Sequence, residues 1–225
     1  AKTFERLCMG QLHETLPRPA GTDPVDHYIQ VLADKTGSLI AVSARYGAML
    51  TRAGAATEGV VEEFGEKIGV AFQLADDVID LAGDSETTGK TPGTDLREGV
   101  DTMPVLLLRK ALAAGELDAA GQAILSRLST GNLADDAVLA DVVARLRLHP
   151  VLARTREMAM TWAREAVGAL AGLEDAVLAG TRERLDAAGA GGAEREAALA
   201  DAARRVALVR EGMEQFARLL VDRAS

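Results

Sequence analysis

Three aspartates, Asp76, Asp77 and Asp80, stand close together in one short segment of the chain. Residues spaced three, four or seven apart share a face of an α-helix, so these carboxylates and the amide of Gln73 are expected along one side of a helix. Neighbouring carboxylates repel one another, and a divalent cation removes that repulsion. Mg²⁺ usually takes one or two protein carboxylates, keeps several waters and leaves positions for phosphate oxygens. The spacing therefore predicts a Mg²⁺ site that binds a phosphate or a diphosphate.

The setting of these acids decides between a metal site and a solvated acidic face. An ordinary surface helix carries its acids on a polar face, but here apolar residues precede them at Gly69–Phe72 and follow them at Val78 and Ile79. A helix this apolar gains no stability from three repelling carboxylates, which favours the metal site. A second acidic pair, Asp135 and Asp136, stands at an expected helix start and indicates capping and first-turn charge instead.

Two lysines could add positive charge for a phosphate ligand. Lys90 lies in the glycine-rich segment 83–99, which we expect to act as a mobile flap that brings the ammonium to an anion held by the aspartates. Lys35 and Thr36 stand beside an expected helix break and offer an ammonium and a hydroxyl to phosphate oxygens, although Lys35 by itself would be an ordinary surface lysine. Residues 83–91 are similar to a nucleotide-binding P-loop, but they are one residue too long and follow a helix, which disfavours that interpretation.

Helices must position all of these groups, because helical periodicity runs through nearly the whole sequence and no segment alternates as a β-strand does. Only 3% of the residues are aromatic, so aliphatic side chains from facing helices must fill the interior, as in a helical bundle. We therefore expect a single all-α domain over residues 1–225. The expected helices are 3–16, 24–50 with a local break at Gly37, 57–81, 102–113, 118–128, 134–148, one from residue 150, and a last one that presents Val206, Val209, Met213, Phe216 and Leu219 on one face.

Two glycine-rich segments are expected to lie outside the helices. Residues 83–99 contain repeated glycines and Pro92, which argue against regular structure. Residues 187–193 consist of glycine and alanine alone, and each glycine in a helix interior costs about 1 kcal/mol relative to alanine. We interpret residues 187–193 as a flexible connector.

Charge and composition narrow the classes of function. The 225 residues include 25 basic and 34 acidic ones, which gives a net charge of −9. This surplus repels phosphate backbones, so a nucleic-acid partner is not expected. The single cysteine, Cys8, cannot form an internal disulfide, and no uncharged stretch approaches the roughly 20 residues that cross a bilayer. We expect a soluble, cytoplasmic protein without a transmembrane segment.

Taken together, these residues resemble the C-terminal part of a trans-isoprenyl (polyprenyl) diphosphate synthase, around the second aspartate-rich motif of that family. The similarity is firm over about residues 4–108 and fades in the later helices. Residues 174–205 look longer than the family usually has, which indicates an insertion. The matching segments are Lys35-Thr36-Gly37, Gly69–Asp80, Gly83-Asp84, Gly89-Lys90, Gly93–Leu96, Glu98-Gly99 and Thr102–Pro104.

The resemblance implies an isoprenoid-synthase-like helical bundle that forms a homodimer. It also implies a prenyltransferase reaction in which an allylic diphosphate ionises, the double bond of isopentenyl diphosphate attacks the cation, and a proton is lost. By the same resemblance, Mg²⁺ assists the departure of the diphosphate, and Lys35 and Lys90 take part in catalysis. The implied metal ligands are Asp76, Asp77 and Asp80, with Asp80 acting through water, and the implied contacts to the allylic diphosphate are Lys35, Thr36, Gln73 and Lys90.

The chain departs from the family pattern in two places. Where many members have a lysine after the Glu-Gly pair, this sequence has Val100 followed by Asp101, so one cation is missing or supplied from elsewhere. Residues 1–75 contain no DDxxD, so the first aspartate-rich motif and the N-terminal helices of the fold are absent. Because the chain opens within a helical pattern and with Ala1 rather than Met, we expect residues upstream to supply them.

Two other interpretations stay open. The chain could be a catalytically incomplete or regulatory homologue or fragment that keeps the fold for dimerisation. It could also be a class I terpene cyclase, which uses DDxxD as well. A cyclase normally carries a second metal motif of the N-x3-[ST]-x3-E type downstream, and none follows Asn132.

Overall fold

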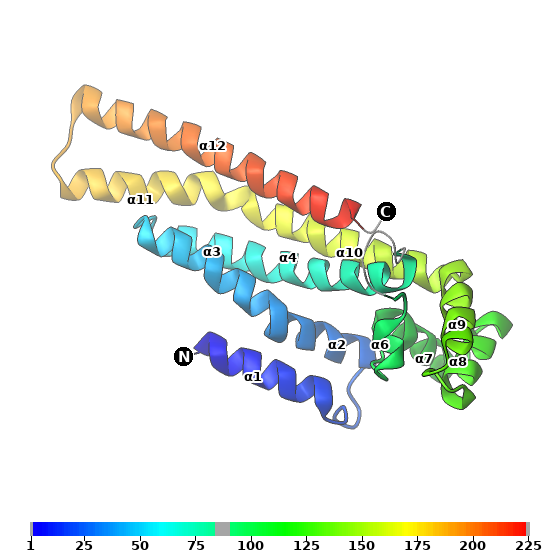
Figure 1. Ribbon diagram of the computed structural model, residues 1–225. Coiled ribbons are helices and arrows are strands. Elements are labelled where there is room, and N and C mark those ends of the chain that lie inside the picture. Colours follow the sequence, from blue (N-terminus) through cyan, green and yellow to red (C-terminus); the bar gives the residue numbers. More distant parts are fainter. Residues whose placement is uncertain (1, 84–90, 224–225) are drawn as a thin grey trace.

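The structure is a computed structural model that describes residues 2–83 and 91–223. Within these ranges the fold consists of helices joined by loops (Figure 1). No strand occurs within these ranges, which confirms the predicted all-α class. In chain order the elements are α1 (Lys2–Thr15), α2 (Pro24–Leu32), a π-helical turn η1 (Ala33–Gly37), α3 (Ser38–Leu50), α4 (Ala55–Ala82), α6 (Thr94–Arg97), α7 (Met103–Ala114), α8 (Ala119–Thr130), α9 (Asp136–Leu148), α10 (Pro150–Ala169), a 3-10 turn η2 (Leu170–Gly172), α11 (Leu173–Ala187) and α12 (Gly192–Asp222).

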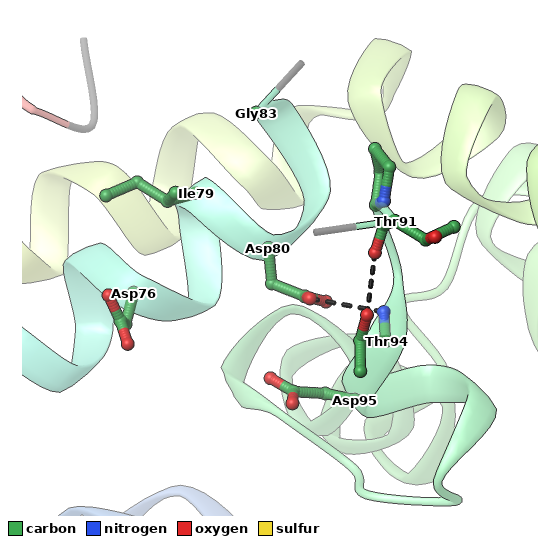
Figure 2. A pocket seen from close by; sticks show the side chains of 8 residues that line it. Asp76, Ile79, Asp80, Gly83, Thr91, Thr94 and Asp95 are labelled. Carbon is green, nitrogen blue, oxygen red and sulfur yellow. Dashed lines mark hydrogen bonds between the residues drawn. The ribbon is translucent and has the colours of Figure 1, made fainter. Parts of the chain in front are cut away.

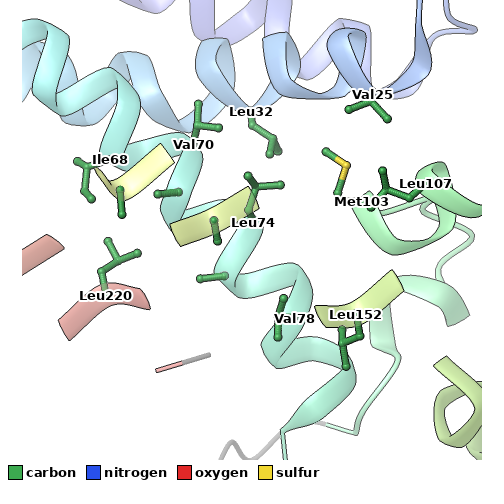
Figure 3. Packing of buried hydrophobic residues seen from close by; sticks show 14 of the residues in the cluster. Val25, Leu32, Ile68, Val70, Leu74, Val78, Met103, Leu107, Leu152 and Leu220 are labelled. Carbon is green, nitrogen blue, oxygen red and sulfur yellow. The ribbon is translucent and has the colours of Figure 1, made fainter. Parts of the chain in front are cut away.

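Helix α4 is the centre of the bundle. It packs along both α3 and α10, and its side chains Ile68, Leu74 and Val78 are completely buried. Figure 3 shows these residues among side chains from α2, α7, α10 and α12, represented by Val25, Met103, Leu152 and Leu220. Burial of apolar surface is the dominant stabilising term in such a core. The acidic segment therefore lies at the carboxyl end of a long helix that its neighbours hold in place.

Two glycines let α4 approach its neighbours closely. A Cβ atom at Gly65 would lie 2.6 Å from the Cα atom of Ala41, and one at Gly69 would lie 2.6 Å from the Cα atom of Gly37. Interiors are already close-packed, so a larger residue at either position would push the helices apart. This contact holds η1, which carries Lys35, directly against α4.

The segment 24–50 is one helical rod with a π-helical middle. Asp23 caps its start by accepting hydrogen bonds from two backbone amides of the first turn at 2.8 and 3.2 Å, as the Asp-Pro sequence predicts. The predicted break at Gly37 is wrong, because Gly37 keeps a helical φ of −54° and the chain enters α3 without turning. Ala33–Gly37 instead form a wider π turn, a feature that is frequent at functional sites.

The glycine-rich segment 83–99 is partly regular. Thr94–Arg97 form α6, a single helical turn, so the prediction that excluded regular structure is wrong there. Gly93 opens α6 with φ of +80°, where a Cβ atom would also lie 2.6 Å from the side chain of Val143. Only glycine adopts this conformation without strain. Gly93, whose presence in the sequence suggests an irregular loop, is thus the residue at which the chain bends to start α6.

The packed face of helix α12 coincides only in part with the predicted one, because Val206 is buried and Met213 packs against the core as predicted, but the other three residues do not. The side chains of Val209, Phe216 and Leu219 are 53%, 50% and 58% exposed, whereas Val206, Ala217 and Leu220 are buried. The buried face lies against α10, α11 and α4. A small side chain such as that of Ala217 lets two helices approach closely, so the size of apolar residues alone does not indicate the packed face.

Helices α11 and α12 form an antiparallel hairpin at one end of the molecule (Figure 1). Their connection, residues 188–191, is shorter than the predicted connector 187–193, whose ends belong to the two helices. Residues 174–205, the predicted insertion, make up most of α11 and the first part of α12. Neither these helices nor any other helix in the described ranges is both long and apolar enough to cross a bilayer.

Candidate active site

The end of α4 brings Asp76 and Asp80 to one small cavity of about 100 Å³. Asp76 is exposed and Asp80 is half-buried. The facing wall is formed by Thr91, Pro92, Thr94 and Asp95. Figure 2 shows Asp80 of α4 and Asp95 of α6 directed toward the space between the two helices. Carboxylate and hydroxyl oxygens therefore dominate the polar lining, and hard cations such as Mg²⁺ prefer such oxygens.

Asp95 lines the cavity, although the sequence alone does not single it out as a site residue. It reaches the cavity because α6 docks on α4: the amide of Gly93 donates to the backbone oxygen of Asp80 at 2.9 Å, and the amide of Thr94 donates to Oδ1 of Asp80 at 3.1 Å. The one sequence signal that could have indicated Asp95 is its place in Gly93–Leu96, one of the segments that carry the resemblance. Lys90, the predicted flap lysine, lies outside the described residues.

Asp77 does not line this cavity, since its side chain is only 5% exposed and points into the core. Its two oxygens accept a hydrogen bond from the hydroxyl of Tyr28 at 3.1 Å each, and Oδ2 also accepts one from the amide of Met103 at 3.0 Å. The predicted arrangement of three acids along one side of α4 is therefore incomplete. Asp76 and Asp80 face the cavity, whereas Asp77 faces α2 and α7.

Loss of hydration dominates the electrostatics of the pair formed by the buried Asp77 and the half-buried Tyr28. It raises the pKa of Asp77 to about 8, and the hydrogen bonds from Met103 and Tyr28 oppose the rise by stabilising the carboxylate. Burial also raises the pKa of Tyr28 far above its usual value, with a further contribution from the charge of Asp77. The phenol therefore keeps its proton and acts as a hydrogen-bond donor.

Lys35 lies apart from the cavity that contains Asp76. Its ammonium pairs with Glu14 of α1, 2.8 Å from each carboxylate oxygen. Thr36 and Gln73 are half-buried, and the described residues that line the cavity include neither of them nor Lys35. The roles of these three residues toward a diphosphate stay predictions.

A larger cavity of about 800 Å³ opens between α1, α2 and α7. Glu14 and Tyr28, the partners of the predicted lysine and of the buried aspartate, both line it. Val100, where the resemblance implies a lysine, lines the same cavity with Arg109 and Lys110 of α7. These two cations pair with acids of neighbouring segments at 2.8 and 2.6 Å. Two cationic side chains, each paired with an acid, therefore lie near the position where the expected lysine is missing.

The carboxylates at the cavity fit a cation whose coordination shell is completed by water and phosphate oxygens. Within residues 2–83 and 91–223, no group of three histidine, cysteine or acidic side chains converges closely enough to hold a metal by itself. Mg²⁺ needs only one or two protein carboxylates when water and phosphate complete its shell. Asp76 and Asp80 meet this smaller requirement.

Comparison with known proteins yields consistent matches. The family model described as "Polyprenyl synthetase" matches residues 1–137. The chain is 39% identical over 177 residues to nonaprenyl diphosphate synthase of Mycobacterium tuberculosis, with 78% of this chain and 50% of that protein covered. It is 31% identical over 176 residues to heptaprenyl diphosphate synthase component 2 of Geobacillus stearothermophilus, with 77% and 51% covered. The chain thus spans about half the length of these relatives.

A solved structure agrees with the sequence matches. Geranylgeranyl pyrophosphate synthase from Corynebacterium glutamicum, complexed with calcium and isoprenyl diphosphate, superposes with a TM-score of 0.70 at 29% identity, covering 100% of this chain and 58% of that one. The family match extends from α1 to the start of α9 and so includes every predicted site residue. On its sequence and its fold, this chain belongs to the polyprenyl synthetase family.

Proposed function

We propose that this chain carries the second aspartate-rich half-site of a prenyltransferase, which binds an allylic diphosphate through Mg²⁺ and condenses it with isopentenyl diphosphate. The observation that carries the proposal is that Asp76, Asp80 and Asp95 line one cavity at the end of α4. The relatives named above are diphosphate synthases, which supports the same chemistry and favours it over the terpene cyclase.

The metal ligands that we propose are Asp76 and Asp80, with Asp95 facing them across the cavity. Bound Mg²⁺ supplies neutralisation of the negative charge that develops on the leaving diphosphate. The residues of this chain supply the orientation: α4 is held by its packed core, and Asp80 fixes the start of α6 through two hydrogen bonds. Ile79 of α4 also lines the cavity, and an apolar lining that excludes water would protect a carbocation from hydrolysis.

Four residues are proposed to contact the diphosphate oxygens, namely Lys35, Thr36, Gln73 and Lys90. Ammonium groups form short, charge-assisted hydrogen bonds to phosphate oxygens, so the two lysines contribute most of this binding. Lys35 exchanges its partner Glu14 for the diphosphate in this proposal. The proposal for Lys90 rests on its place between glycines in the segment that precedes Thr91.

The complete reaction also needs the first aspartate-rich motif and the residues that bind isopentenyl diphosphate. The resemblance assigns the first aspartate-rich motif and the isopentenyl diphosphate contacts to residues that this sequence does not contain. We therefore assign to this chain only the binding of Mg²⁺ and of the allylic diphosphate. A homodimer and a cytoplasmic location are further proposals that rest on the resemblance and on the single cysteine, Cys8.

Calorimetric titration tests the proposed function. Mg²⁺ with an allylic diphosphate analogue is titrated into the parent chain and into an Asp76→Asn/Asp80→Asn variant. Loss of the ligands should lower the affinity at least about tenfold. An Asp175→Asn variant, altered at an exposed acid of α11, is the control and should match the parent. Equal affinity in the parent and the double variant would contradict the proposal.

A further inference from the structure

Asp77 and Asp80 tie one downstream segment to α4 at both of its ends. Asp80 accepts hydrogen bonds from backbone amides at the start of α6, including that of Thr94 at 3.1 Å. Oδ2 of Asp77 accepts a hydrogen bond of 3.0 Å from the backbone amide of Met103, the first residue of α7. The segment between these two points carries Asp95, which lines the cavity. Asp77 and Asp80 therefore fix the position of the segment that brings Asp95 to the cavity.

Helix α7 has no cap of its own. Thr102 occupies the N-cap position, but its side chain makes no capping hydrogen bond. The first amides of a helix need acceptors, and a buried amide without one destabilises the fold. Asp77 supplies the acceptor from α4, while the hydroxyl of Tyr28 holds the same carboxylate from α2. Three elements that are distant in sequence thus meet at a single buried carboxylate.

The neighbouring acid Asp76 has the opposite environment. It is exposed and lines the cavity, and within the described residues it forms no hydrogen bond or ion pair. Its carboxylate is therefore available to a cation. Asp77 uses both of its oxygens inside the core, where a hydrated cation has no access.

We propose that Tyr28, Asp77 and the amide of Met103 form a clasp that positions Asp76 and Asp95, and that Asp77 is a positioning residue rather than a metal ligand. The inference rests on the proposed function, because it takes Asp76 and Asp80 as the ligands. The clasp acts by fixing the start of α7 and the end of α4 relative to each other. Small displacements of ligands weaken a metal site strongly, so loss of the clasp lowers metal affinity without removing a ligand.

Substitutions at Asp77 separate the two roles. Asparagine keeps the clasp, because its oxygen accepts the amide of Met103 and its amide nitrogen donates to the oxygen of Tyr28. In titrations with Mg²⁺ and inorganic diphosphate, Asp77→Asn should stay within about threefold of the parent, whereas Asp77→Ala and Asp76→Asn should each lose about tenfold or more. A loss in Asp77→Asn as large as in Asp76→Asn would overturn the inference and make Asp77 a ligand.

Tyrosine variants test the clasp from its other side. The chain has two tyrosines, and Tyr46 on α3 is 57% exposed, which makes Tyr46→Phe a matched control. Tyr28→Phe should lower the affinity for Mg²⁺ and diphosphate severalfold with an unchanged circular dichroism spectrum, and Tyr46→Phe should change neither. An unchanged affinity in Tyr28→Phe would show that the tyrosine does not position the site.

Amide hydrogen exchange distinguishes failure of the clasp from failure of the proposed function. In Asp77→Ala the amide of Met103 should exchange at least about tenfold faster than in the parent, and in Asp77→Asn its rate should stay near that of the parent. Unchanged exchange in Asp77→Ala means that the clasp does not hold α7. A parent chain that binds no Mg²⁺ with diphosphate would instead refute the proposed function, and the positioning role with it, whatever the exchange rates.

Discussion

The ammonium of Lys35 lies 2.8 Å from both carboxylate oxygens of Glu14, although 21 residues separate the two in sequence. The pair joins α1 to the π-helical turn, and both side chains are only partly exposed. A carboxylate in this position competes with any diphosphate for the same lysine. The resting partner of a predicted catalytic group is thus an acid of the same chain.

Removal of this competitor should strengthen diphosphate binding. Glu14→Gln frees Lys35, and since partly exposed ion pairs contribute about 0.2–1 kcal/mol, the affinity for diphosphate should rise by a factor of about 1.4 to 5. Glu5→Gln, at an exposed acid on the same helix, is the control and should have no effect. Calorimetry measures both, and the gain should vanish when Lys35→Ala is added. A weaker affinity in Glu14→Gln would mean that Glu14 orients Lys35 instead of competing for the diphosphate.

Substitution of the glycines of α4 should have opposite effects at two positions. In Gly69→Ala the new Cβ atom would lie 2.6 Å from the Cα atom of Gly37, so we expect a loss of about 1–3 kcal/mol in the free energy of unfolding. In Gly59→Ala no neighbouring atom lies within 4 Å, so the more rigid alanine should add about 0.5–1 kcal/mol. Urea denaturation measures both, and equal stabilities would contradict the close approach of α4 to η1.

The raised pKa of Asp77, about 8 in the fold against 3.8 as its ordinary value, makes stability depend on pH. The folded state binds this proton more tightly than the unfolded state, so the free energy of unfolding should fall as pH rises from about 4 to about 8. Asp77→Asn removes the charge, so its stability advantage over the parent should grow across that range by a few kcal/mol, on the order of 1.4 kcal/mol per pKa unit. The parent and the variant have all other titrating groups in common, so the contributions of those groups cancel in the difference between the two free energies of unfolding. The comparison is made by urea denaturation without divalent metal, and a difference that does not change with pH would refute the buried, protonated acid.

The lysine predicted to act from the glycine-rich segment has its own test. Lys90→Ala should weaken the affinity for diphosphate about tenfold or more, because a charge-assisted hydrogen bond contributes about 1.5–3 kcal/mol. The melting temperature should stay that of the parent. Lys67→Ala, at a lysine on α4 that pairs with Glu63, is the control. Unchanged affinity in Lys90→Ala would remove this lysine from the site.

The sequence predicts most helices well, because apolar periodicity and Asp-Pro or glycine boundaries are local signals. The start of α2 at Asp23 and Pro24 and the long α4 follow from such signals. The π turn at Ala33–Gly37 and the single turn of α6 do not, because each depends on contacts with α4 that no local pattern records.

The site shows the same division. Helical spacing places Asp76, Asp77 and Asp80 near one another, but which of them faces the core depends on where α2 and α7 pack. The partner of Asp77 is 49 residues away in the chain, so the sequence offers no measure of its burial. Asp95 enters the site only through the docking of α6 on Asp80.

The central claim is that Asp76 and Asp80 hold a divalent cation beside Asp95, and a paramagnetic ion locates such a site directly. Mn²⁺ is added in small steps with inorganic diphosphate to the isotope-labelled chain, and the amide signals are followed by nuclear magnetic resonance. We expect the strongest broadening at the signals of residues 76–80 and 94–95, and no such broadening in Asp76→Asn/Asp80→Asn. Broadening centred on another cluster of acids, or unchanged in the double variant, would contradict it.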